Sequence, residues 1–191
     1  MKKNLLISIL YTLATTVLLG ILYPLAVTGL AQVFFHRQAN GDLITAGDKI
    51  VGSHLLGQPF TAAGYFYSRP SAAGAAGYDP TASGGSNFGP TNKMLIDRVT
   101  ASVQQLQPTN PNTPIPADLV TTSGSGLDPD ISPASADFQV PRVAKERGMS
   151  EQDVRALVSK HTKGRQWGFL GEPRVNVLDL NLDLDAAHPM H

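Results

Sequence analysis

An uncharged apolar stretch at the start of the chain constrains its fold more than any other feature. Residues 4–35 read NLLISILYTLATTVLLGILYPLAVTGLAQVFF and contain no Asp, Glu, Lys or Arg. A helix needs about 20 apolar residues, at ~1.5 Å rise each, to cross the hydrocarbon core of a bilayer. The stretch exceeds that length, so we expect a single transmembrane helix within residues 1–35 and a separate domain over residues 36–191.

Small and helix-loosening residues mark one set of positions in this helix. Pro24 and Gly29 should loosen it, which membrane helices tolerate when their neighbours satisfy the freed carbonyl groups. Together with Thr16 and Gly20, they predict a face that docks on other membrane helices, because small residues let helix backbones approach closely. A purely lipid-facing anchor is the alternative, and the leucine-rich remaining faces fit it equally well.

Flanking charges predict the orientation of the helix. Lys2 and Lys3 precede it with the free amino terminus, and only His36 and Arg37 flank its far end. Basic residues are favoured on the cytoplasmic side, so the N-terminus is expected in the cytoplasm and the following domain outside it. A cleaved signal peptide ending near residues 29–31 is the alternative, but the apolar run is much longer than the usual segment of about 7–15 residues.

Composition excludes several classes of function. The formal net charge is +0, which gives no indication of nucleic-acid binding. The chain has no cysteine, so disulfides and thiolate metal sites are excluded. Nine of its 18 glycines and ten of its 14 prolines lie between residues 57 and 133. We therefore predict an α+β fold in which the domain is mixed α/β and rich in loops.

Periodicity and capping residues predict the elements of this domain. Helical spacing of apolar residues predicts a helix over 92–107, capped by Thr91 or Asn92. Ser132-Pro133 should start another helix, weakened at Pro141, that ends near Gly148. Ser150 and Asp153 resemble a capping box for a helix over 151–162. The predicted strands are 49–57, 64–70, 118–123 and 173–185. A long loop is predicted over 71–92. In the last strand the apolar phase shifts after Val177, which indicates a bulge or a change of element.

A glycine-rich stretch before the first predicted helix of the domain is the main candidate site. Residues 82–92 read ASGGSNFGPTN. From Gly84 this matches GxxxxG, but Pro90 stands where a phosphate-binding P-loop has lysine. The amides near the helix start could still hold an anion, although the residues alone favour a tight loop packed on the domain or a partner. The candidate nucleotide-binding or loop-docking residues are Ser83, Gly84, Gly85, Ser86 and Asn87.

No residues suggest a catalytic or metal site. Asp128 and Asp130 flank a proline and predict a turn. Asp179, Asn181, Asp183 and Asp185 alternate, so in a strand they would form one solvated face; they lack the glycine and distal glutamate of a calcium loop. The histidines are dispersed. Arg69 and Arg142 could bind carboxylates or brace the long loops.

Several long stretches together resemble one family. They are YPLAVTG (23–29), GQPFTAAGYFYSRPSAA (57–73), YDPTASGGSNFGPTN (78–92), PADLVTTSGSGLDPDISPASADFQVPRVAKERG (116–148) and GEPRVNVLDLNLDLD (171–185). On these stretches the chain is identified as a member of the KdpC family, the C subunits of the Kdp potassium-transporting P-type ATPase.

The resemblance implies a single-pass bacterial inner-membrane subunit with no catalytic residues of its own. Its implied partners are the pore subunit KdpA, the ATP-hydrolysing subunit KdpB, the small subunit KdpF and the lipid bilayer. It also implies a role in assembly and as a catalytic chaperone that raises the affinity of KdpB for ATP, with potassium as the transported ion and no firmly bound cofactor. The family's glycine loop has been likened to the LSGGQ signature of ABC transporters, and Ala82 and Ser86 depart from that signature here.

The expected topology conflicts with a direct role of the loop in ATP binding. If the N-terminus is cytoplasmic, the loop faces the periplasm, where ATP is scarce. We therefore expect the domain to lie over the periplasmic entrance of the pore subunit and to affect ATP affinity indirectly. A membrane-tethered periplasmic ligand-binding domain and an ATP-binding regulatory subunit are the alternatives.

Overall fold

The computed structural model describes residues 1–190 and separates into two compact units, which meet between Leu43 and Ile44. The first unit consists of the helices α1 (Lys2–Val17), η1 (Leu18–Leu22), α2 (Tyr23–Phe34) and α3 (His36–Ala39). Lys2–Phe34 forms one uninterrupted helical stretch of 33 residues with none buried, long and apolar enough to cross a membrane. This finding is consistent with the predicted transmembrane helix.

The apolar helix is widened directly before its proline. Pro24 has no backbone N–H, and in a regular α-helix its ring would clash with the carbonyl of Gly20. The chain avoids this clash with the π-helical turn η1, in which the Tyr23 N–H reaches back to the carbonyl of Leu18. The predicted loosening at Pro24 is thus confirmed, whereas Gly29 lies in the regular helix α2.

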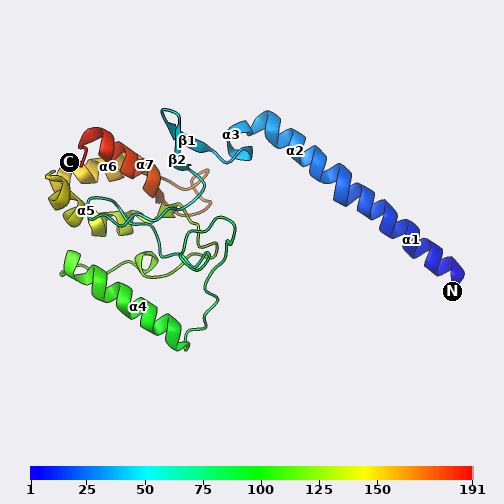
Figure 1. Ribbon diagram of the computed structural model, residues 1–191, viewed down its shortest axis with the longest axis horizontal. Helices are drawn as coiled ribbons and strands as arrows, with labels where there is room; N and C mark the ends of the chain where they lie inside the picture. Colours follow the sequence, from blue (N-terminus) through cyan, green and yellow to red (C-terminus); the bar gives the residue numbers. More distant parts are fainter. Residues whose placement is uncertain (191) are drawn as a thin grey trace. The chain divides into compact units, whose positions relative to one another are not determined.

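The second unit mixes helices with very short strands. A hairpin of β1 (Leu43–Ala46) and β2 (Lys49–Ser53) begins where the two units meet. An antiparallel sheet has the order β3 (Asp130–Ile131), β5 (Arg174–Asn176), β4 (Thr162–Lys163). The helices are α4 (Lys93–Leu106), η2 (Gln107–Thr109), η3 (Ala117–Leu119), α5 (Pro133–Arg147), α6 (Glu151–His161) and α7 (Val177–Ala187). The mixed α/β class is as predicted, and long irregular segments connect these elements (Figure 1).

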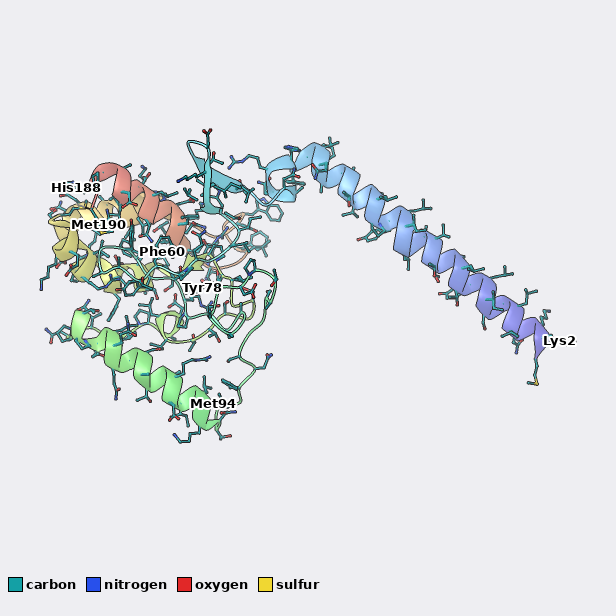
Figure 2. All side chains as sticks on the ribbon, viewed as in Figure 1. Lys2, Phe60, Tyr78, Met94, His188 and Met190 are labelled. Carbon is teal, nitrogen blue, oxygen red and sulfur yellow. The ribbon has the colours of Figure 1, made fainter. Side chains whose placement is uncertain are left out.

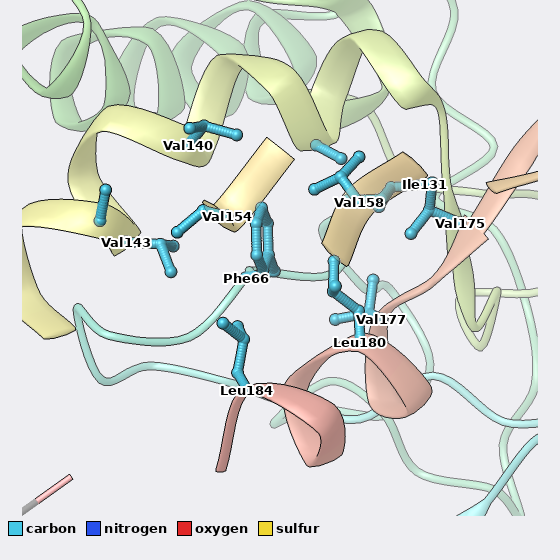
Figure 3. Packing of buried hydrophobic residues seen from close by; sticks show 12 residues of the cluster. Phe66, Ile131, Val140, Val143, Val154, Val158, Val175, Val177, Leu180 and Leu184 are labelled. Atoms are coloured by element: carbon cyan, nitrogen blue, oxygen red, sulfur yellow. The ribbon is translucent and has the colours of Figure 1, made fainter. Parts of the chain in front are cut away.

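The core lies between α5, α6, α7 and β5. Phe66 is fully buried and lies at the centre of this cluster (Figure 3), although it comes from an irregular segment rather than from a helix or strand. A smaller cluster joins Leu106, at the end of α4, to Phe138 of α5. The other buried members of the main cluster are Ile131, Ala136, Val140, Val143, Ala144, Val154, Val158, Val175, Val177, Leu180 and Leu184.

The predicted helix ends are confirmed. The Asn92 side chain accepts a hydrogen bond from the Met94 N–H and caps α4. Ser132 caps α5, which runs unbroken through Pro141 to a left-handed Gly148 with φ of 65°. The Ser150 hydroxyl accepts from the Asp153 N–H, at 3.1 Å, and donates to the Asp153 carboxylate, at 2.6 Å. Ser150 therefore caps α6 as predicted, whereas the Asp153 carboxylate accepts from the Ser150 hydroxyl and not from its backbone N–H, so the capping box is only half formed.

Residues 64–70 do not form the predicted strand. The segment is extended, but two side-chain amides take the place of a neighbouring strand. The Asn181 amide accepts from the Phe66 N–H, at 2.9 Å, and donates to the Phe66 carbonyl, at 3.0 Å. The Gln139 amide accepts from the Tyr67 N–H, at 2.8 Å, and donates to the Tyr67 carbonyl, at 3.3 Å. The pattern of apolar residues was correct, whereas the hydrogen-bond partners come from helices α7 and α5.

Two other strand predictions are also wrong. Residues 118–123 contain the end of η3 instead of a strand. Residues 173–185 are not one strand but change from β5 to α7 at Val177, so the change of element that the shift in apolar phase indicated is confirmed. The helix begins there because the Asn176 side chain accepts a hydrogen bond from the Asp179 N–H at 3.1 Å. The predicted single face of acidic residues is consequently absent, since alternate residues of a helix point in different directions.

The Asn181 amide should be essential for stability. Asn181→Ala would leave the buried N–H and carbonyl of Phe66 without partners, at about 1–3 kcal/mol each. We expect the free energy of unfolding of the second unit to fall by roughly 2–5 kcal/mol, measured by urea denaturation of the full chain in detergent with near-ultraviolet circular dichroism. The control is Gln104→Ala, which removes an exposed amide on α4. This variant should change the free energy of unfolding by less than about 0.5 kcal/mol. Equal stability of the two variants would contradict this role of Asn181.

Candidate functional site

The glycine-rich loop lies against a second irregular segment, residues 122–126. The Gly84 N–H donates to the Ser125 carbonyl at 2.7 Å, and the Ser83 hydroxyl donates to the same carbonyl at 3.1 Å. A phosphate cradle needs backbone N–H groups that point at the ligand. In this loop the Gly84 amide is instead bonded within the protein.

Glycine is required where the two segments meet. Gly126 has a φ of 66°, and a Cβ added there would lie 2.6 Å from the Gly84 carbonyl oxygen and 2.8 Å from the Ala73 nitrogen. A Cβ on Gly85 would lie 3.2 Å from the carbonyl oxygen of Gly124. The two backbones therefore approach more closely than side chains would allow.

The far end of the loop turns toward α4. Asn87 adopts the left-handed conformation, with φ of 52°, which asparagine tolerates better than most residues. The Arg98 guanidinium, from α4, donates to the Ser86 hydroxyl at 3.4 Å and lies 5.8 Å from the centre of the Phe88 ring. The five predicted site residues are thus held between the 122–126 segment and α4.

Two residues that were not predicted hold the base of the loop. The Ser71 hydroxyl donates to the Gly126 carbonyl at 2.6 Å and accepts from the Tyr78 N–H at 2.7 Å. The Tyr78 hydroxyl donates to the Arg69 carbonyl at 2.6 Å, and burial raises its pKa. Tyr78 lies among the irregular segments (Figure 2). No spacing pattern in the sequence marks Ser71 or Tyr78, because Ser71 contacts residue 126, far away in the chain.

Both predicted bracing arginines contact the irregular segments. Arg69 forms an ion pair with Asp128 at 3.0 Å and donates to the Thr122 carbonyl at 3.3 Å. Arg142 donates to the carbonyls of Ala63 and Tyr65, and burial lowers its pKa. Arg69 therefore binds a carboxylate and braces a loop, and Arg142 braces a loop.

A cleft of about 590 Å³ opens beside this loop assembly, and its lining carries charges of both signs. The cleft includes Asp130, paired with Arg174 at 3.0 Å; burial raises the pKa of this carboxyl. Burial also acts to raise the pKa of Asp118, but hydrogen bonds from Ser135 and Ser132 outweigh it and lower that pKa. The lining does not include Ser83–Asn87. Within residues 1–190, no group of three or more His, Asp or Glu side chains is placed to hold a metal ion.

The predicted docking positions of the apolar helix are exposed in the chain by itself. Thr16 lies near the end of α1, Gly20 in η1, and Pro24 and Gly29 in α2. A Cβ added at Gly29 would meet nothing within 4 Å. The surface at Gly29 is therefore open to a neighbouring helix, and docking there stays a prediction.

Comparisons with known proteins agree over nearly the whole chain. A family model described as "KdpC: K+-transporting ATPase, c chain" matches residues 5–186. The chain is similar to the potassium-transporting ATPase KdpC subunit of Koribacter versatilis, with 63% identity over 190 residues, covering 100% of this chain and 98% of the relative. The subunits of the same name from Rhodopseudomonas palustris strain BisB18 and Caulobacter vibrioides strain NA1000 are 56% and 59% identical, covering 98% and 91% of this chain and 100% and 88% of those relatives.

The contact between the two segments should depend on glycine at one position and not at a neighbouring one. Gly126→Ala would force a side chain into the left-handed region against the Gly84 carbonyl, and should lower the free energy of unfolding by about 2 kcal/mol or more. It should also make the loop susceptible to limited proteolysis. Gly124→Ala is the matched control, because an added Cβ there meets nothing within 4 Å. Equal effects of the two variants would show that the close approach is not required.

Proposed function

This chain belongs to the KdpC family, the c chains of K+-transporting ATPases, and on that premise we propose that it is a non-catalytic membrane subunit that stabilises the assembly of an ATP-driven potassium importer. The observation that carries the proposal is the family match over residues 5–186. The partners are the pore subunit KdpA, the catalytic subunit KdpB and the small subunit KdpF. Catalysis then belongs to KdpB.

The glycine loop supports an indirect influence on ATP affinity. Its Gly84 amide is bonded to Ser125, and Pro90 stands in place of a phosphate-binding lysine. A subunit that binds one conformation of a complex more tightly than another shifts the populations of both. If the conformation it favours also binds ATP better, it raises ATP affinity without touching the nucleotide, and about 1.4 kcal/mol of coupling gives a tenfold effect. This is the catalytic-chaperone role that we propose.

The loop segments can transmit such a preference because hydrogen bonds and an ion pair connect them. Arg69 and Ser71 bind Asp128 and the Gly126 carbonyl, and the Tyr78 hydroxyl donates to the Arg69 carbonyl. A partner that contacts one of these segments therefore acts on all of them. With the N-terminus in the cytoplasm, the second unit lies in the periplasm, over the entrance of the pore subunit.

The cleft beside the loops favours a second candidate function, that of a membrane-tethered periplasmic ligand-binding domain. Arg69 and Arg174 line a space of about 590 Å³, large enough for a small molecule. Both arginines are already paired, with Asp128 and Asp130 respectively. A ligand would have to displace these pairs, so we rank this function below the assembly role. It predicts that the chain alone binds a small molecule, which the assembly role does not.

The assembly role should depend on small residues in the apolar helix. We expect the combined variant Thr16→Leu, Gly20→Leu and Gly29→Leu to abolish co-purification of the partner subunits, because larger side chains prevent close approach of helices. Cells with this variant should also fail to grow when potassium is scarce. The helix would stay apolar and therefore remain in the membrane. The control combines Ile7→Leu, Leu13→Ile and Leu25→Ile, at exposed positions of the same helix. Normal assembly of the first variant would refute the docking face.

A further inference from the structure

One loop of the second unit exposes an unusual group of large apolar side chains. Residues 164–172, between β4 and β5, carry Trp167, Phe169 and Leu170, which are 85%, 67% and 42% exposed. We name these three residues the aromatic tip. Large apolar side chains gathered at one exposed place usually mark a contact with a protein or a membrane.

The aromatic tip is held in place by its own loop. Gln166 and Leu170 exchange two backbone hydrogen bonds, both 2.9 Å long. Arg165 and Glu172 close the base of the loop with an ion pair of 2.6 Å. Trp167 has a φ of 52°, a conformation that costs free energy for a residue with a side chain. The loop thus holds its aromatic rings outside the core, in a fixed and costly conformation.

A second apolar group starts close to the base of this loop. Its residues belong to β2 and the turn after it, and all are exposed to at least 36%: Ile50, Val51, Leu55 and Leu56. Residues next to the two groups contact the same carboxylate. The Asp179 carboxylate is 2.9 Å from the ring of His54, which precedes Leu55, and 3.8 Å from the ammonium of Lys163, which precedes the loop. In Figure 1 the loop after β4 lies beside β2, in agreement with these contacts.

The side chains around the base of the tip are charged, and their charges balance. Lys160, Lys163 and Arg165 lie within or just before the loop, and they pair with Asp183 at 2.6 Å, Asp179 at 3.8 Å and Glu172 at 2.6 Å. Aromatic side chains with polar groups beside them suit the headgroup level of a bilayer. The aromatic tip is therefore complementary to a lipid surface in polarity.

The chain between the apolar helix and the hairpin is short. Eight residues lie between Phe34, where α2 ends, and Leu43, where β1 starts, and α3 takes up four of them. At ~1.5 Å per helical residue and ~3.5 Å per extended residue, they reach about 25 Å at most. The hairpin that carries the second apolar group therefore begins within this distance of the helix end.

We propose that the aromatic tip, with the apolar residues of β2 and its following turn, inserts into the interfacial region of the bilayer that the Lys2–Phe34 helix crosses. The Trp167 indole suits the headgroup level, where its ring is buried and its N–H stays hydrated. Phe169 and Leu170 reach the start of the acyl chains. This contact needs the bilayer alone, and it orients the second unit on the membrane before any partner subunit binds.

Trp167 is the only tryptophan of the chain and so reports on this contact by itself. The full chain would be reconstituted into vesicles of phosphatidylcholine and phosphatidylglycerol, with and without acyl chains brominated close to the headgroup. We expect the Trp167 emission to shift to shorter wavelength and to lose most of its intensity with the brominated lipid. An emission typical of exposed tryptophan, unquenched by the brominated lipid, would overturn the proposal. So would burial of Trp167 that requires KdpA, KdpB and KdpF in the same vesicles, because the tip would then contact a protein.

Two matched variants test whether the tip itself makes the contact. Phe169→Ser removes an apolar ring from the tip, and Met94→Ser removes a side chain of similar exposure, 64%, at the start of α4 (Figure 2). We expect Phe169→Ser to lose most of the quenching and Met94→Ser to keep it. Equal quenching in Phe169→Ser and in the unchanged chain would contradict insertion of the tip.

Discussion

The second unit depends on one constraint: its buried backbone groups need hydrogen-bond partners although it has little sheet to supply them. Each strand of the β3–β5–β4 sheet has only two or three residues. Side chains supply the missing partners, above all the amides of Asn181 and Gln139, which bind the backbone around Phe66. Burying an unpaired backbone group costs about 1–3 kcal/mol, so these amides let an irregular segment form the centre of the core.

The same principle explains the glycine-rich loop. Ser125 and Ser71 supply its partners, and glycine lets the backbones of two distant segments meet. The Gly84 amide is bonded to the Ser125 carbonyl, so it does not point at a ligand. The family match and this geometry together support a subunit that acts on its partners by contact. In the proposed assembly role ATP chemistry belongs to KdpB, and the proposed lipid contact of Trp167 would fix the orientation in which the unit meets its partners.

Local signals in the sequence predicted much of this structure. Asn92, Ser132 and Ser150 marked helix starts because capping acts within three residues. The strand predictions at 64–70 and 173–185 failed because alternating apolar residues specify burial but not the partner of the backbone, and that partner comes from distant side chains. For the site, the resemblance and the glycines indicated the loop at residues 83–87, and its role stays a prediction. Ser71 and Tyr78 could not be predicted, since their roles exist only when residues far apart in sequence are brought together.

The central claim is that the second unit acts outside the cytoplasm, where its glycine loop cannot serve as an ATP site. The chain has no cysteine, so a single introduced thiol can be labelled without interference. Gln104→Cys places it on an exposed part of α4, and Lys3→Cys places it in the first turn of the apolar helix. With a membrane-impermeant maleimide on cells with a permeabilised outer membrane, our account predicts labelling of Gln104→Cys at once and of Lys3→Cys only after lysis. The reverse pattern would place the loop in the cytoplasm and contradict the account.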